Sequence, residues 1–298
     1  MADRTAMRHE VDEGGLQGVL LRPEDGGPYP GVLVLGGSRG GVREELAASL
    51  AGHGLACLAL AYFGAGRLPP AIVEIPLECV ERAAHWLADH PAVTGLPVGV
   101  VGGSKGAELG LLAASRFPEL IGPVVAIAPA SVAFFGLDRQ GDDPSAMARS
   151  SWSHRGRPVP FVPYPTGAQP VSSDAGLAVA PIYEAALANL EAVSAANIPV
   201  EQARGPILLV SGEDDRMWPA ARMAEMIVAR MAGHGRSADV THLCYPGAGH
   251  RLLGAAAQQP AVGGERMPFD YGGTDEADAG ARDDAWEQAA AFLRRHLV

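Results

Sequence analysis

Short apolar runs alternate along the chain with longer segments in which apolar residues recur at helical spacing. Between residues 71 and 90, for example, Val80, Ala84 and Leu87 fall on one face of a helix. Strands are expected at 17–22, 31–36, 55–61, 97–101, 123–128, 206–211 and 240–245. Helices are expected at 42–53, 71–90, 105–116, 219–232 and 278–296. This alternation predicts an α/β fold, with a mostly parallel central sheet that helices cover on both faces.

The segment 136–176 interrupts this alternation. It is rich in proline, glycine, serine and aspartate, and Trp152, Phe161 and Tyr164 are spread along it. Long irregular segments inside compact domains are typically lids or binding loops. Because the sequence shows neither an internal repeat nor a linker, we expect a single domain over 1–298 with a lid inserted at about 136–176.

Composition and charge exclude several classes of function. The net charge of −11 argues against a nucleic-acid partner, although a local group of arginines can still bind an anionic ligand. The three cysteines, Cys57, Cys79 and Cys244, form no CxxC pair, so neither a metal site nor a disulfide framework is expected. The charged start MADRTAMRHEVDEGG does not resemble a signal peptide, and no apolar run approaches the roughly 20 residues of a membrane span. A cytoplasmic location is therefore expected.

The first chemical signal is a serine placed between a predicted strand and a predicted helix. The stretch Gly102-Gly103-Ser104-Lys105-Gly106 has the GxSxG pattern of a nucleophile elbow. A serine on such a strained turn projects its hydroxyl above the sheet, and larger side chains two positions before or after it would clash. The following helix directs its N-terminal dipole and backbone N–H groups at the same point. Ser104 is therefore predicted to be a catalytic nucleophile.

A nucleophilic serine requires a base and an orienting acid, in the order serine, acid, histidine along an α/β-hydrolase chain. His250 follows the predicted strand 240–245 on a glycine-rich turn and is the expected base. Three acids follow the strand 206–211, and of these we choose Asp215, because the third position after Gly212 can point back toward His250. Asp214 is the alternative, and its other role would be to cap the following turn.

The oxyanion of the reaction requires backbone donors. The N–H of Lys105 is one candidate, and the N–H of Gly37 or Ser38, in the loop LGGSRGG, is the other. Lys105 is the only lysine in the chain. Its side chain is expected to pair with Glu108 or to hold a neighbouring loop carbonyl.

With these residues placed, the chain resembles the catalytic domain shared by acyl-CoA thioesterases and bile acid-CoA:amino acid N-acyltransferases. The matching segments, in the order of that family, are PYPGVLVLGGSRGG, YFGAGRLPPAIVEIPLECVERAAHWLADHP, VGVVGGSKGAELGLLAASRFP, SSWSHRGRPVPFVP, GPILLVSGEDDRMWP, YPGAGH and YGGTDEADAGARDDAWEQAAAFLRRHL. The resemblance implies an α/β-hydrolase fold with Ser104, Asp215 and His250 as the triad. Two departures are noted: too few residues precede the first predicted strand for the family's N-terminal β-sandwich domain, and RLLGAAAQQPAVGGERMPFD replaces a proline-rich stretch after His250.

The resemblance also implies an activity. Ser104 stands where the amino acid N-acyltransferases carry cysteine, which favours hydrolysis of acyl-CoA thioesters through an acyl-serine. No metal or cofactor is expected, since coenzyme A enters as part of the substrate. The alternatives are acyl transfer to an amine or alcohol, with an acyl carrier protein as a further possible donor, and a carboxylesterase or dienelactone-hydrolase-like activity. A binding protein without catalysis is a third alternative, which the complete residue set disfavours.

Substrate contacts are expected from two groups of residues. Arginines near the mouth of the site would meet the negative charges of coenzyme A, and the candidates are Arg39, Arg43, Arg67, Arg155 and Arg157. Trp152 and Phe161, from the expected lid, would supply apolar contacts to the acyl group.

Overall fold

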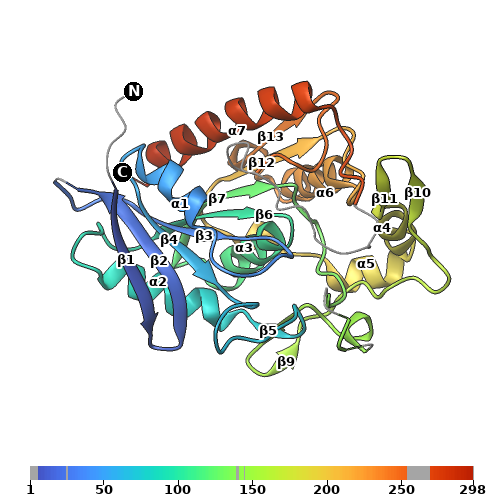
Figure 1. Cartoon of the computed structure of the whole chain (residues 1–298), viewed down its shortest axis with the longest axis horizontal. Helices are drawn as coiled ribbons and strands as arrows, with labels where there is room; N and C mark the ends of the chain where they lie inside the picture. The colour runs from blue at the N-terminus through green and yellow to red at the C-terminus, as the bar shows by residue number, and fades with distance from the viewer. Residues whose placement is uncertain (1–5, 25, 139–140, 144, 254–268, 298) are drawn as a thin grey trace.

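The computed structural model describes residues 6–24, 26–138, 141–143, 145–253 and 269–297. An eight-stranded sheet runs through its centre in the order β1-β2-β4-β3-β6-β7-β12-β13 (Figure 1). Its strands are β1 (Ala6–Glu13), β2 (Leu16–Pro23), β3 (Gly31–Leu35), β4 (Ala56–Ala61), β6 (Val98–Gly103), β7 (Ile121–Ile127), β12 (Ile207–Gly212) and β13 (Val240–Tyr245). The β1–β2 and β2–β4 pairs are antiparallel, and every other neighbouring pair in this sheet is parallel.

Helices cover both faces of this sheet. The helices that lie between or after the strands of this sheet in the sequence are α1 (Glu44–Ala51), α2 (Glu78–Asp89), α3 (Lys105–Arg116), α6 (Ala220–Gly233) and α7 (Asp275–His296). Figure 1 shows α7 along one side of the sheet and α2 along the other. Alternate residues of β3 explain the two layers, since Leu33 and Leu35 join one apolar core while Val32 and Val34 join the other. The predicted α/β architecture is confirmed.

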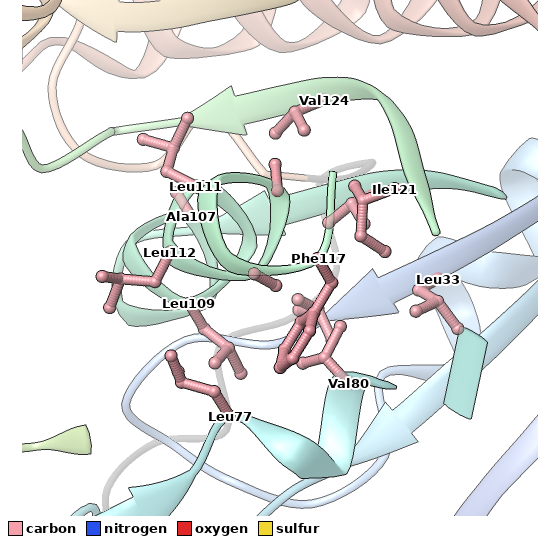
Figure 2. Packing of buried hydrophobic residues seen from close by; sticks show 14 of the residues in the cluster. Leu33, Leu77, Val80, Ala107, Leu109, Leu111, Leu112, Phe117, Ile121 and Val124 are labelled. Atoms are coloured by element: carbon pink, nitrogen blue, oxygen red, sulfur yellow. The ribbon is translucent and has the colours of Figure 1, made fainter. Parts of the chain in front are cut away.

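The helix that carries the site, α3, is enclosed on all sides. Its residues from Lys105 to Ser115 are all buried, and Leu109 and Leu112 pack in the same cluster as Leu77 and Val80 (Figure 2). A helix that is buried on every face is held by packing from every direction. Its N-terminus therefore has little freedom to move relative to the sheet.

Several elements differ from the expectation. Strand β1 was not predicted, because only Val11 of its residues is buried and its sequence AMRHEVDE lacks an apolar run. The helix expected from residue 71 begins at Glu78, since the chain before it forms the short strand β5 (Ile75–Pro76). The helices α4 (Ala180–Leu187) and α5 (Leu190–Ala196) were also not predicted.

The segment 136–176 is in part a fixed piece of the core and not a lid throughout. It contains the 3₁₀ turn Ala146–Ala148 and the strands β8 (Trp152–His154), β9 (Arg157–Pro158) and β10 (Val171–Ser173), the last of which pairs with β11 (Gly176–Ala178). Strand β8 lies between β5 and β9 in a separate small sheet. Trp152 and Val162 are both fully buried and each belongs to an apolar core cluster.

Within the described residues, no helix combines the length and the apolarity that crossing a membrane requires.

Candidate active site

Ser104 sits on a strained turn between β6 and α3. Its backbone angles, φ 55° and ψ −120°, lie in a region that residues with a side chain rarely adopt. A Cβ on Gly102 would collide with the carbonyl oxygen of Gly106, and a Cβ on Gly106 would collide with the carbonyl oxygen of Leu35. Steric clashes thus explain why both outer positions of the GxSxG pattern are glycine, and the turn has the geometry of a nucleophile elbow.

His250 is paired with the acid chosen from the sequence. A hydrogen bond of 2.7 Å joins His250 Nδ1 to Asp215 Oδ2, and the Asp215 side chain is only 2% exposed. The other carboxylate oxygen accepts the backbone N–H groups of Met217 at 2.9 Å and Trp218 at 3.2 Å. Because an ionised carboxylate can only accept, this arrangement places the proton of a neutral imidazole on Nδ1 and leaves Nε2 free to take one.

Asp214, the alternative acid, has different partners. One of its oxygens accepts the N–H of Gly273 at 3.0 Å, and the other lies 3.3 Å from Arg216 Nε. Its side chain is 44% exposed. These contacts tie the loop after β12 to the loop before α7, so the geometry favours Asp215 as the partner of His250.

Packing brings the histidine loop to the nucleophile elbow. A Cβ on Gly103, next to Ser104, would lie 2.5 Å from a methyl group of Leu253, which is three residues beyond His250. In the described part of the chain, no hydrogen bond joins Ser104 Oγ to His250. Such bonds are often long before a substrate binds and shorten in the reacting complex.

Two aromatic residues that no sequence motif signalled lie beside the imidazole of His250. Trp218 meets it edge-on, with ring centroids 6.1 Å apart, and Tyr271 lies at a tilt, with centroids 6.3 Å apart. The backbone N–H of His250 donates to the carbonyl of Tyr271 at 2.9 Å. Asp278 of α7 accepts the N–H of Gly249 at 2.7 Å.

The contact between the histidine loop and the start of α7 had a signal in the sequence. The segment MPFDYGGTD ends at the start of α7, and its glycines and acids suit a tight turn against another loop.

The residues of two expected oxyanion donors, Lys105 and Gly37, lie next to Ser104. Lys105 is the first residue of α3, and a Cβ on Gly37 would lie 3.3 Å from Ser104 Cβ and 3.9 Å from its Oγ. The buried phenol of Tyr62 donates a 2.5 Å hydrogen bond to the carbonyl of Gly36. The carbonyl of Gly36 and the N–H of Gly37 belong to one peptide group and point in opposite directions when it is trans. Tyr62 therefore sets the direction of the Gly37 N–H.

We expect Tyr62→Phe to lower kcat for an acyl thioester about tenfold while KM changes much less, because an oxyanion donor acts mainly in the transition state. Burial raises the pKa of Tyr62 well above its usual value, so the phenol stays a donor across the working pH range. The measurement is steady-state kinetics beside a thermal melt. Tyr29→Phe is the matched control, since it removes a phenol hydroxyl from a residue outside the site. An unchanged kcat in Tyr62→Phe would show that the Gly36–Gly37 peptide holds its direction without the phenol.

The single lysine lies in a buried polar cluster behind the nucleophile. Lys105 Nζ donates to Glu108 Oε2 at 2.9 Å and to Ser151 Oγ at 2.8 Å, and it lies 3.5 Å from the carbonyl oxygen of Phe135. The Lys105 and Glu108 side chains are 1% and 0% exposed. Burial lowers the pKa of Lys105, and the adjacent Glu108 carboxylate opposes that shift. Both expected contacts of the lysine, with Glu108 and with a loop carbonyl, are therefore present.

Trp152 belongs to the same cluster, which corrects its expected role. Its indole N–H donates to Glu108 Oε1 at 2.6 Å, and the backbone N–H of Phe134 donates to the same oxygen at 2.9 Å. The Trp152 side chain is fully buried and packs against Tyr62. It thus anchors its segment to α3 and does not line an open acyl site. Phe161 is half-buried between two apolar cores.

The five candidate arginines are not gathered at one place. Arg39 reaches the site, where its Nη2 lies 3.3 Å from the hydroxyl of Tyr271. Arg43 pairs with Glu45, and Arg67 pairs with Asp12 of the edge strand β1, so both have acidic partners. Arg155 and Arg157 are exposed beside the turn between β8 and β9. Of the five, Arg39 is the one that contacts a neighbour of His250.

Comparison with known proteins places this chain in a family. The family described as BAAT / acyl-CoA thioester hydrolase C terminal matches residues 75–298. The chain belongs to this family. The sequence-based resemblance is therefore confirmed.

Relatives in the family carry names of two reactions. Mouse acyl-coenzyme A amino acid N-acyltransferase 2 is 32% identical over 98% of this chain and 66% of its own length. Human acyl-coenzyme A thioesterase 1 is 32% identical over 97% of this chain and 65% of its own length. Mouse bile acid-CoA:amino acid N-acyltransferase is 30% identical over 98% of this chain and 66% of its own length. The chain thus spans slightly less than two thirds of the relatives it matches.

Solved structures support the fold. Dienelactone hydrolase from Anabaena variabilis superposes with a TM-score of 0.53 at 18% identity, with all of both chains covered. The dienelactone hydrolase-like promiscuous phosphotriesterase P91 from metagenomic libraries gives a TM-score of 0.57 at 15% identity, with 98% of each chain covered. At these identities the likeness concerns the fold alone, and it confirms the α/β-hydrolase architecture of this family member.

Proposed function

We propose that this chain hydrolyses acyl-CoA thioesters through an acyl-Ser104 intermediate. The observation that carries the proposal is the 2.7 Å hydrogen bond between Asp215 and His250, which follow the neighbouring parallel strands β12 and β13. The family of this chain includes relatives named acyl-CoA thioesterases. The backbone strain at Ser104 supports the assignment, because such strain concentrates at functional sites.

The first half of the reaction forms the acyl-enzyme. His250 Nε2 takes the proton of Ser104 Oγ as the oxygen attacks the thioester carbonyl carbon. The carbonyl oxygen becomes an oxyanion, which the N–H of Lys105 and the N–H of Gly37 or Ser38 stabilise. The C–S bond then breaks, the electron pair leaves with sulfur, and the protonated His250 supplies a proton to the thiolate. Throughout these steps, Asp215 stabilises the imidazolium and holds its orientation.

The second half releases the acid. His250 removes a proton from a water molecule as its oxygen attacks the acyl-serine carbonyl. The same backbone donors hold the second oxyanion. Collapse of this intermediate breaks the C–Oγ bond, returns the proton to Ser104 and leaves a carboxylic acid. Coenzyme A is a substrate in this scheme and not a cofactor.

Acyl transfer to an amine is the second candidate, because relatives named N-acyltransferases match at the same 32% identity as those named thioesterases. Both reactions share the acyl-serine and differ in what attacks it. A carrier protein could deliver the acyl group in either case. A carboxylesterase activity is a third candidate, which rests on the shared fold.

A single product assay separates these candidates. We expect purified protein to release free thiol from acyl-CoA and to yield the carboxylic acid, with little amide when glycine or taurine is present at millimolar concentration, because water attacks an oxygen ester adequately once His250 acts as base. Thiol release is followed with a chromogenic disulfide, and acid and amide are quantified by mass spectrometry. Amide in excess of acid would favour the transferase, and faster cleavage of the matched methyl ester than of the thioester would favour the esterase.

A further inference from the structure

Two arginines from distant parts of the chain meet on Tyr271, the aromatic neighbour of His250. Arg39 lies in the loop LGGSRGG, whose Gly37 is close to Ser104, and its Nη2 donates to the Tyr271 hydroxyl at 3.3 Å. Arg251 directly follows His250, and its Cζ lies 4.6 Å from the centroid of the Tyr271 ring. Both guanidinium groups are therefore held beside the site, and Arg251 contacts the ring that packs on the imidazole.

Among the described residues, the two arginines differ from most others in having no acidic side chain as an ion-pair partner. Nine described arginines, Arg43 and Arg67 among them, form ion pairs with Asp or Glu side chains. Within the described residues, neither Arg39 nor Arg251 forms such a pair. On a chain of net charge −11, two unneutralised guanidinium groups beside one catalytic histidine form a local positive site.

Arg251 also has an unsatisfied donor. Its Nε is buried and has no hydrogen-bond partner among the described residues. Arg282 of α7 donates to the backbone carbonyl of Arg251 at 3.1 Å and so holds the main chain at this position. A buried N–H without an acceptor costs free energy that a bound anion can recover.

We propose that Arg39 and Arg251 bind a phosphate carried on the pantetheine arm of the thioester donor. This inference rests on the proposed function and identifies how that donor is recognised. A guanidinium presents its N–H groups in a planar fork that matches phosphate oxygens. The thioester must lie at Ser104, and the phosphate lies at the far end of the pantetheine arm. The residues that bind the phosphate must therefore lie to one side of the reacting atoms. The guanidinium of Arg251 contacts Tyr271, whose ring centroid lies 6.3 Å from that of His250, so this group lies beside the reacting atoms.

Coenzyme A and carrier proteins share the 4′-phosphate of this arm, and the experiment separates this phosphate from the nucleotide phosphates that coenzyme A alone carries. We would measure kcat/KM for one acyl group on three donors: N-acetylcysteamine, which has no phosphate, 4′-phosphopantetheine, and coenzyme A. In Arg39→Gln and in Arg251→Gln we expect the ratio of kcat/KM for the coenzyme A donor to that for N-acetylcysteamine to fall about tenfold. Arg251→Lys should recover part of the ratio, because it restores the charge without the fork.

Arg295→Gln is the matched control, since it removes one positive charge from an exposed position in the last turn of α7. Its ratio should equal that of the wild type. A fall already present with 4′-phosphopantetheine supports binding of the 4′-phosphate. A fall confined to coenzyme A would contradict the proposal, because the arginines would then bind the nucleotide phosphates and not the pantetheine arm. Turnover of N-acetylcysteamine thioester also shows that each variant is folded.

Three further results would overturn the inference. An unchanged ratio in both arginine variants would exclude phosphate recognition, and an equal loss on all three donors would show that the arginines act through His250 or through folding. An equal fall in Arg295→Gln would show a general effect of charge. A wild-type protein that cleaves none of the three thioesters would instead contradict the proposed function itself.

Discussion

Replacing Ser104 with alanine is expected to lower kcat for acyl-CoA hydrolysis by at least about a thousandfold, because no acyl-enzyme can form without the hydroxyl. The residual rate would come from the oxyanion donors and from binding alone. KM should change little, since the hydroxyl contributes mainly to the reacting complex. Thiol release measured over a range of substrate concentrations gives both constants.

The matched control for Ser104→Ala lies on the same helix. Ser115 is buried in α3, and its hydroxyl donates to the carbonyl of Leu111. Ser115→Ala should keep kcat near the wild-type value, because alanine is favourable in a helix interior. A covalent fluorophosphonate probe should label the wild type and Ser115→Ala but not Ser104→Ala. Thioesterase activity of Ser104→Ala above a tenth of the wild-type value would exclude Ser104 as the nucleophile.

Asp215→Asn is expected to lower kcat by about 10³- to 10⁴-fold, far more than Asp214→Asn. The asparagine keeps the shape of the side chain and can still accept from Met217 and Trp218. Its amide would donate to His250 Nδ1, so the imidazole would carry its proton on Nε2 and could not take one from Ser104. The two substitutions remove the same charge from adjacent positions, which makes each the control of the other.

Asp214→Asn should reduce kcat by no more than about threefold, because its exposed side chain can still accept from Gly273 as an amide. The measurement is kcat/KM of both variants across pH, with circular dichroism to verify folding. Equal losses in the two variants, or a larger loss in Asp214→Asn, would assign the orienting role to Asp214.

The features that sequence reasoning predicted well depend on local constraints. The strand–turn–helix around Ser104 could be predicted because the GxSxG pattern spans only five residues, and the clash that requires glycine at position 102 is with Gly106 of the same turn. Asp215 and His250 each follow a predicted strand, so in a parallel sheet both were expected at the carboxyl ends of the strands. Their hydrogen bond agrees with that placement. Alternating burial in β3 likewise follows from period-two geometry.

The features that were missed depend on partners distant in sequence. Trp152 lies in a segment rich in proline and glycine, and its buried indole donates a hydrogen bond to Glu108, which is 44 residues away. Tyr62 and Tyr271 are single aromatic residues whose roles come from the loops they contact, not from a motif around them. Strand β1 has few buried residues, so its polar sequence carries little periodic signal.

The buried position of Lys105 has a consequence for the chemical reactivity of the protein. Thioesters acylate exposed amines without an enzyme, yet the single lysine of this chain is 1% exposed and its ammonium donates to Glu108 and Ser151. In the folded state this lysine is therefore shielded from the substrate that the protein is proposed to handle. Amine-directed reagents would modify Lys105 only when the packing behind the nucleophile opens, so the labelling of one residue reports the local integrity of the active site.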